Sequence, residues 1–161
     1  MSSSTAIAAA VAPPASIPAE FLFTLSLDIA WAHDIGATPL GHKRFAGIAG
    51  GRFEGTRLRG VVCAGGSDWI QVRPDDIRQV DVRILLQTHD GALIAMRYEG
   101  YRLPAAQTET GLAGHSEHAY RVAALFECAD ARYAWLNGTL AVGLGTRVPP
   151  AGPVYEVFSV R

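Results

Sequence analysis

Three polar side chains that could do acid–base chemistry, those of Arg83, Tyr98 and Asp81, lie in two apolar segments joined by Asp90-Gly91. Asp-Gly between alternating segments predicts a β-hairpin, because a type I′ turn needs positive φ at both central residues. If these two residues form the loop, Arg83 pairs with Tyr98 and shares a face with Asp81. The predicted face consists of Asp81, Arg83, Leu85, Gln87, Ile94, Met96, Tyr98 and Gly100.

This predicted face supports two interpretations. In the functional one, Arg83 binds a carboxylate or an enolate-like oxygen, Tyr98 donates a proton, and a nearby acid serves as the base. In the structural one, Arg83 and Asp81 form a partly buried ion pair that holds the register, and Tyr98 donates to it. A guanidinium in an apolar wall needs a partner in either case. The sequence leaves both interpretations open.

Asp68-Trp69 is a second candidate pair, because it follows the flexible Gly65-Gly66 and could be presented at the mouth of a barrel. Alternatively, Asp68 caps the backbone of the glycine turn and Trp69 plugs the barrel end. Asp68 therefore joins Arg83, Tyr98 and Asp81 as a candidate catalytic residue. The candidate ligand-binding residues are Trp69, Met96, Trp135, Asn137 and Tyr155.

We expect neither a metal nor a cofactor. His115, Glu117 and His118 lie within four residues, but no third ligand has useful spacing, so solvated loop histidines are the better interpretation. P-loop, nucleophile-elbow and H-E-x-x-H motifs are absent from the sequence. The glycine pairs lack the following helix that a dinucleotide site requires.

Period-2 patterning and frequent Gly/Pro turns predict the elements that position these residues. No segment of ten or more residues has a helical stripe. We therefore predict an all-β fold, a single antiparallel barrel of roughly 8–10 strands, because a closed wall suits a few polar residues facing a cavity. Besides the hairpin over 81–100, strands are expected at 21–31, 44–50, 57–64, 68–72, 118–127, 133–144 and 154–160, with a loop at 32–42.

Composition bounds the domain organisation and the partners. The chain has 161 residues, 49% of them hydrophobic, and a net charge of −1. We expect one barrel domain over 21–161, a flexible Ala/Ser/Pro-rich tail over 1–20, and a long loop over 101–117 that could act as a lid. Nucleic acid and membrane partners are not expected. Two isolated cysteines and the weak apolar character of the tail favour a cytoplasmic location, and homo-oligomerisation stays open.

Four segments together resemble a known family. They are GGRFEGTRLRGVVCAGGSDW (50–69), DVRILLQTHDGALIAMRYEG (81–100), RYAWLNGTLAVGLG (132–145) and VYEVFSV (154–160). In combination they resemble the bacterial and fungal domain of unknown function 3237, over about residues 21–160. The resemblance implies a small β-barrel, similar in fold to allene oxide cyclase, dirigent and lipocalin-type barrels. It implies no common activity, because a fold does not fix a function.

Three functions are consistent with these observations. We favour a cofactor-independent enzyme, an isomerase, cyclase, lyase or hydrolase, that acts by general acid–base chemistry on a small apolar, oxygenated or aromatic molecule. The first alternative is a non-catalytic barrel that binds a similar ligand, and it differs from the enzyme only in pKa tuning. The second is a structural homo-oligomer, which would be favoured if Leu85, Met96 and Phe126 fill the lumen.

Overall fold

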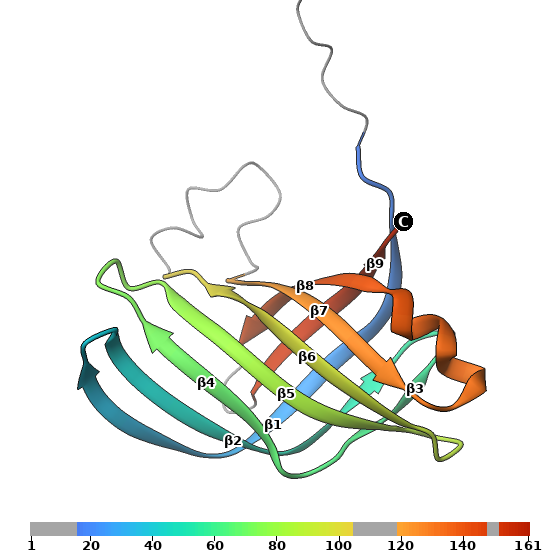
Figure 1. Ribbon diagram of the computed structural model, residues 1–161, viewed down its shortest axis with the longest axis horizontal. Helices are drawn as coiled ribbons and strands as arrows, with labels where there is room; N and C mark the ends of the chain where they lie inside the picture. The colour runs from blue at the N-terminus through green and yellow to red at the C-terminus, as the bar shows by residue number, and fades with distance from the viewer. Residues whose placement is uncertain (1–15, 105–118, 148–151) are drawn as a thin grey trace, which may run out of the picture.

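The computed structural model describes residues 16–104, 119–147 and 152–161, which form nine strands and one short helix (Figure 1). The strands are β1 (Ala19–Thr38), β2 (Gly41–Glu54), β3 (Arg59–Val62), β4 (Gly66–Val72), β5 (Arg78–Thr88), β6 (Leu93–Arg102), β7 (Tyr120–Cys128), β8 (Leu140–Arg147) and β9 (Pro153–Val160). The 3-10 helix η1 (Ala131–Gly138) connects β7 to β8.

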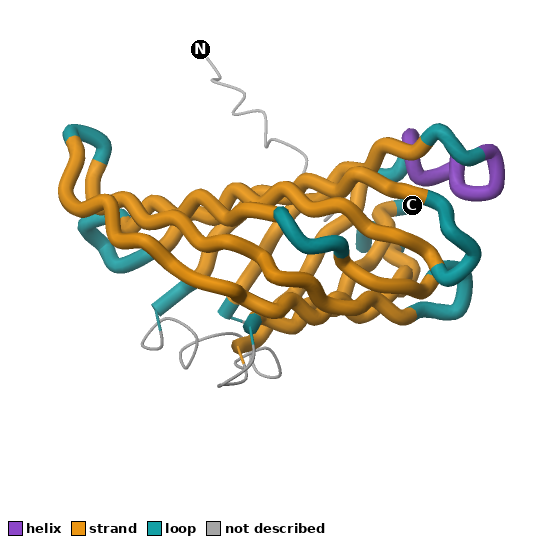
Figure 2. Tube along the Cα trace, turned by 90° about the horizontal axis from the view of Figure 1, so that it is seen from below, coloured by secondary structure: helices purple, strands orange, loops and turns teal. Residues whose placement is uncertain are grey.

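A single antiparallel sheet closes on itself to form a barrel. Its strands follow the order β1-β9-β8-β7-β6-β5-β3-β2-β4, and the additional pairing of β1 with β2 closes the ring. Both β3 and β4 lie between β2 and β5, at opposite ends of these two long strands. Figures 1 and 2 show the strands running obliquely around one lumen. The predicted antiparallel barrel is confirmed.

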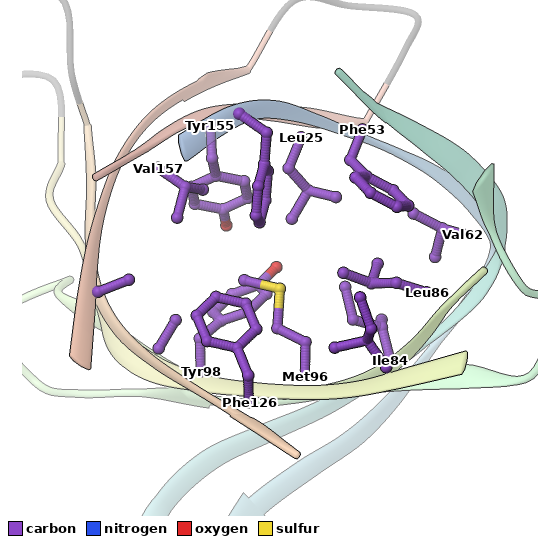
Figure 3. Close-up of a cluster of buried hydrophobic side chains, with 14 of the residues drawn as sticks. Leu25, Phe53, Val62, Ile84, Leu86, Met96, Tyr98, Phe126, Tyr155 and Val157 are labelled. Atoms are coloured by element: carbon purple, nitrogen blue, oxygen red, sulfur yellow. The ribbon is translucent and has the colours of Figure 1, made fainter. Parts of the chain in front are cut away.

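Apolar side chains from every wall pack into the lumen, because alternate residues of a strand point to opposite faces (Figure 3). Phe23 meets Phe53 and Phe126 edge to face, with ring centroids 5.6 and 6.2 Å apart. At the barrel end that carries η1, Tyr133 and Leu136 are also buried. This end is therefore filled with side chains. The buried positions of β5 illustrate the alternation and are Val80, Val82, Ile84, Leu86 and Thr88.

The β5–β6 hairpin turns over three residues, His89-Asp90-Gly91, so the predicted two-residue loop is wrong. The Thr88 N–H donates to the Ala92 carbonyl at 2.9 Å, and the Gly91 N–H donates to the Thr88 carbonyl at 2.9 Å. Gly91 has a φ of +89°, as expected where a turn is followed by a left-handed residue. The Thr88 hydroxyl stabilises this longer loop by donating to Asp90 and accepting from the Ala92 N–H.

The longer loop shifts the pairing by one residue and splits the predicted face. Arg83 lies opposite Arg97, whereas Tyr98 lies opposite Val82. Ile94, Met96 and Tyr98 therefore point into the lumen, as predicted for that strand. Because the side-chain period is two, their predicted neighbours on β5 take the other side of the wall. The residues of β5 that face away from the lumen are Asp81, Arg83, Leu85 and Gln87.

β1 is longer and less regular than predicted. It continues to Thr38 and pairs with β2, so the predicted loop over 32–42 is instead the end of a hairpin. Register shifts after Asp28 and Ile29 turn the strand, and Ile29 and Trp31 are 37% and 47% exposed rather than buried. Another shift after Phe21 leaves that ring exposed. Bulges break strict alternation, which is the only signal that the prediction used.

Helix η1 replaces the first part of the strand predicted over 133–144. Asp130 caps it by accepting from the Arg132 N–H at 3.0 Å. The Asn137 side chain then binds the backbone of Cys128, accepting from its N–H at 2.7 Å and donating to its carbonyl at 2.9 Å. These side-chain contacts occupy backbone groups that a continued strand would have paired.

Gly51 is required where β2 pairs with Leu27 of β1, and we expect Gly51→Ala to destabilise the barrel. Its φ is +144°, and a Cβ there would lie 2.1 Å from the Ser26 carbonyl oxygen. Backbone strain alone costs about 1–3 kcal/mol, and the clash adds to it. Urea denaturation measures the loss. Gly138→Ala is the control, because a Cβ there meets nothing within 4 Å and stability should be kept. Equal stability of both variants would contradict this account.

Two predicted segments fall largely outside the described residues. Residues 1–15 of the predicted tail, residues 105–117 of the predicted lid and residue 118 of the strand predicted over 118–127 belong to this part, which includes His115, Glu117 and His118. Within the described ranges, no helix has both the length and the apolar character needed to cross a membrane.

Candidate functional site in the barrel mouth

A cavity of about 120 Å³ opens at the barrel end opposite η1. At this end β5 begins at Arg78, β6 ends at Arg102 and β7 begins at Tyr120. These three residues are paired with one another across the sheet. The lining combines apolar walls with one carboxyl, two phenols and four guanidiniums. It consists of Leu27, Ile29, Ala32, Arg44, Ala46, Ile48, Asp68, Ile70, Arg78, Val80, Val82, Tyr98, Arg102, Tyr120, Arg147 and Pro153.

Asp68 and Tyr98 lie at one level of the barrel wall. Asp68 of β4 pairs with Val82 of β5, and Val82 pairs with Tyr98 of β6. The small side chain of Val82 thus separates a carboxyl and a phenol that both point inward. On the other side, Asp68 is paired with Ala46 of β2, which also leaves space above it. Strand pairing therefore fixes both polar groups on one inner surface.

Asp68 is a buried carboxyl that favours its protonated form. Burial is the largest effect and raises the pKa of Asp68 to about 7, while a backbone hydrogen bond from Asp81 lowers it and the charge of Asp81 raises it. Among the described residues no cation lies within ion-pair distance of Asp68. At neutral pH this carboxyl is thus poised between its two protonation states, as a general acid or base requires.

Three tyrosines continue from this level into the mouth. The Tyr98 and Tyr155 rings are 5.3 Å apart between centroids, and the Tyr120 and Tyr155 rings are 5.5 Å apart. Figure 3 shows Tyr98 and Tyr155 pointing into the lumen from facing walls. Burial, followed by the neighbouring Tyr155, raises the pKa of Tyr98 well above its usual value. Tyr98 is therefore a neutral hydrogen-bond donor at physiological pH.

Four arginines surround the opening, which we call the arginine ring: Arg44, Arg78, Arg102 and Arg147. No ion pair holds any of them within the described residues. Arg78 and Arg102 are paired across β5 and β6, so two like charges lie side by side. Burial, followed by the charges of Arg102 and Arg44, lowers the pKa of Arg78. The arginine ring makes the mouth strongly positive, although the whole chain is almost neutral.

Four buried side-chain atoms in the described part of the chain lack a hydrogen-bond partner: Asp68 Oδ1, Tyr98 Oη, Arg44 Nε and Arg102 Nε. All four belong to residues that line the mouth cavity. An unpaired buried polar atom costs about 1–3 kcal/mol, so a protein rarely keeps several at one place without a use for them. Their convergence identifies the mouth cavity as the candidate site.

The structure separates the four predicted catalytic residues. Asp68 and Tyr98 come together in the mouth cavity, whereas Arg83 is exposed on the outer surface. Asp81 lines a shallow groove on the outside, next to Glu99. The proposed ion pair between Arg83 and Asp81 does not form. The three-residue hairpin loop is the physical reason, because it moves both side chains to the outer face.

The predicted ligand-binding residues also divide. Met96 and Tyr155 are buried in the lumen next to the site. Trp69 is 44% exposed on the outer surface, where its ring packs against the Phe45 ring with centroids 4.4 Å apart and planes tilted by 42°. Trp135 and Asn137 belong to η1, at the opposite end.

The arginine ring and Tyr120 were missed by the sequence analysis, yet a signal for them exists. Arg78 has the same phase as the buried Val80 and Val82, and Arg102 has the same phase as Tyr98. A charged residue at the end of a strand, in phase with core positions, points into a barrel mouth. Within the described part of the chain, no three His, Cys, Asp or Glu side chains gather where they could hold a metal ion.

The fold and the site define a class: a closed antiparallel β-barrel, packed at one end, with a charged cavity at the other. The chain belongs to the family described as Protein of unknown function (DUF3237), whose model matches residues 17–160. The resemblance seen in the sequence is thus confirmed.

Relatives of known structure share this barrel. A β-barrel-like protein from Acinetobacter baumannii is 32% identical, with a TM-score of 0.80 over 92% of this chain and 99% of its own. An enzyme from Penicillium herquei is 23% identical, with a TM-score of 0.73 over 94% and 99% of the two chains. In sequence, a UPF0311 protein of Rhodopseudomonas palustris is 24% identical over 82% of this chain and 90% of its own.

Proposed function

We propose that this protein is an enzyme that moves a proton on a small oxygenated molecule in the mouth cavity. Asp68 is the general acid or base, and Tyr98 donates a hydrogen bond to the substrate oxygen. The observation that carries this proposal is the convergence of four buried, unpaired polar atoms on one cavity. A structural relative that is described as an enzyme supports catalysis at the level of the fold.

The chemistry follows from the protonation states. With a pKa of about 7, Asp68 can remove a proton when ionised and return it when neutral, both near physiological pH. Negative charge that develops on the substrate oxygen would meet the Tyr98 hydroxyl, which lies at the same level as Asp68. Fixed donors of this kind stabilise an oxyanion in the transition state. Isomerisation, cyclisation and elimination all use such a step.

The cavity also bears on the two alternatives. Met96 and Phe126 do fill the closed half of the lumen, as a structural role would require, but Leu85 lies outside and the mouth half stays open. A volume of about 120 Å³ is somewhat less than the roughly 150 Å³ of a cavity that binds benzene, so the mouth cavity has the scale of one ring. Only turnover requires the raised pKa of Asp68.

The ring opening of 5-nitrobenzisoxazole tests the proposal. In this reaction a base removes one C–H proton, the N–O bond breaks, and a cyanophenolate forms. We expect the rate to rise with pH to a plateau with a midpoint near 7, because ionised Asp68 is the base. A midpoint near 4 would contradict the raised pKa, and equal rates for the wild type and Asp68→Asn would remove Asp68 from the mechanism.

Tyr98→Phe is expected to slow the same reaction while keeping the fold. The variant keeps the buried ring and deletes only a hydroxyl whose neighbour is the Tyr155 hydroxyl, so the free energy of unfolding should change by no more than about 1 kcal/mol. Loss of one oxyanion donor should lower the rate by about 10²- to 10³-fold. Tyr101→Phe is the control, since Tyr101 is 45% exposed on the outer face of the same strand. A destabilised Tyr98→Phe with a normal rate would make Tyr98 structural.

A further inference from the structure

The polar groups of the mouth cavity occupy two levels. The inner level is the row of Asp68, Val82 and Tyr98 across three neighbouring strands. The outer level is the row of Arg78, Arg102 and Tyr120. Val82 follows Arg78 by four positions along β5, a distance of about 13 Å along the strand.

An apolar band lies between these levels. Ile70 of β4 pairs with Val80 of β5, and both line the cavity. Leu27 and Ile29 of β1 also line the cavity and contribute further aliphatic surface. A ligand that spans the cavity therefore contacts polar groups at both ends and hydrocarbon in the middle.

The outer level favours the binding of an anion. Three guanidiniums, those of Arg78, Arg102 and Arg147, lie there without an ion pair among the described residues. Arg102 is held over the Tyr120 ring, with its guanidinium carbon 5.6 Å from the ring centroid, and its Nε remains unpaired. Guanidiniums bind carboxylates and phosphates through paired N–H groups, and one such group would offset the crowding of like charge.

We propose that the substrate is a ring-bearing oxyanion, a carboxylate or a phosphate monoester, with a second oxygen at its far end. The anionic group binds among the outer guanidiniums, the ring contacts the apolar band, and the second oxygen lies beside Asp68 and Tyr98. This assignment of substrate class rests on the proposed function for its inner end. Its outer end depends on the arginine ring alone.

Calorimetric titration with three single-ring probes tests the assignment. The wild type should bind 4-hydroxybenzoate or 4-hydroxyphenyl phosphate about tenfold or more tightly than the uncharged 4-hydroxybenzyl alcohol. Whichever of the two anions binds more tightly shows whether the substrate carries a carboxylate or a phosphate. In Arg78→Met and in Arg147→Met the preference should fall below about threefold, whereas Arg83→Met, on the outer face, should keep it. Melting curves establish that each variant is folded.

The outcomes separate this inference from the proposed function. Equal binding of charged and neutral probes by the wild type, or a preference that survives in both Arg78→Met and Arg147→Met, overturns the inference. If the wild type prefers the anionic probe but Asp68→Asn keeps the ring-opening rate, the proposed function is overturned and the anion site is retained.

Discussion

Asp68→Asn is expected to raise the free energy of unfolding by up to about 4 kcal/mol at pH 8 and to leave it nearly unchanged at pH 3.5. The pKa of Asp68 is about 7 in the folded protein, against 3.8 for an ordinary aspartate. As the pH rises, the unfolded chain loses this proton first, so the wild type loses stability between about pH 4 and pH 7 and then levels off. Each unit of pKa difference is worth about 1.36 kcal/mol.

Asparagine cannot ionise, so the variant should lack this decline. Chemical denaturation of both proteins across the pH range measures this decline in stability, and Asp28→Asn, at an exposed position of β1, should behave like the wild type.

The same Asp68→Asn variant should lose about 10²- to 10⁴-fold in the ring-opening rate, the usual contribution of a general base. A more stable but inactive variant is the signature of a functional buried charge. Parallel stability curves for wild type and variant would contradict it.

Arg102→Met is expected to weaken benzoate binding by about 10- to 100-fold without loss of stability. A hydrogen bond to a charged group is worth about 1.5–3 kcal/mol, and methionine keeps the apolar stem while removing the charge. Arg102 has no ion-pair partner among the described residues and lies opposite Arg78, so its removal relieves like-charge crowding. Calorimetric titration with benzoate and thermal melting are the two measurements.

Arg83→Met is the matched control for this variant. It makes the same chemical change on the neighbouring strand but on the outer face, where Arg83 is exposed. We expect it to change neither benzoate affinity nor stability by more than about 0.5 kcal/mol, as for most surface positions. If Arg102→Met destabilised the barrel and bound benzoate normally, Arg102 would be a structural residue.

The barrel could be predicted from the sequence because alternation is a property of each strand by itself. The segment over 81–100 shows both the strength and the limit of that signal. Its two strands and their turn were predicted, and Tyr98 and Met96 point inward as expected. The pairing between the strands depended on whether the loop has two or three residues. The Thr88 hydroxyl decided this through side-chain contacts, and a shift of one residue moved Arg83 out of the site.

The site was predicted in part for a related reason. Asp68 and Tyr98 were both candidates, but nothing in one sequence says that Val82 lies between them. The β5–β6 hairpin brings Arg78 and Arg102 together, but Arg44 and Arg147 come from β2 and β8, which are distant in the chain. Closure of the sheet brings all four charges to one opening, because closure fixes which strand ends meet.

The pKa of the Asp68 carboxyl, measured by carbon-13 NMR with Asp68→Asn for assignment, tests the central claim most directly. The free protein should show a titration near 7. A titration near 4, the value of an ordinary aspartate, would contradict the tuned carboxyl on which the proposed function depends.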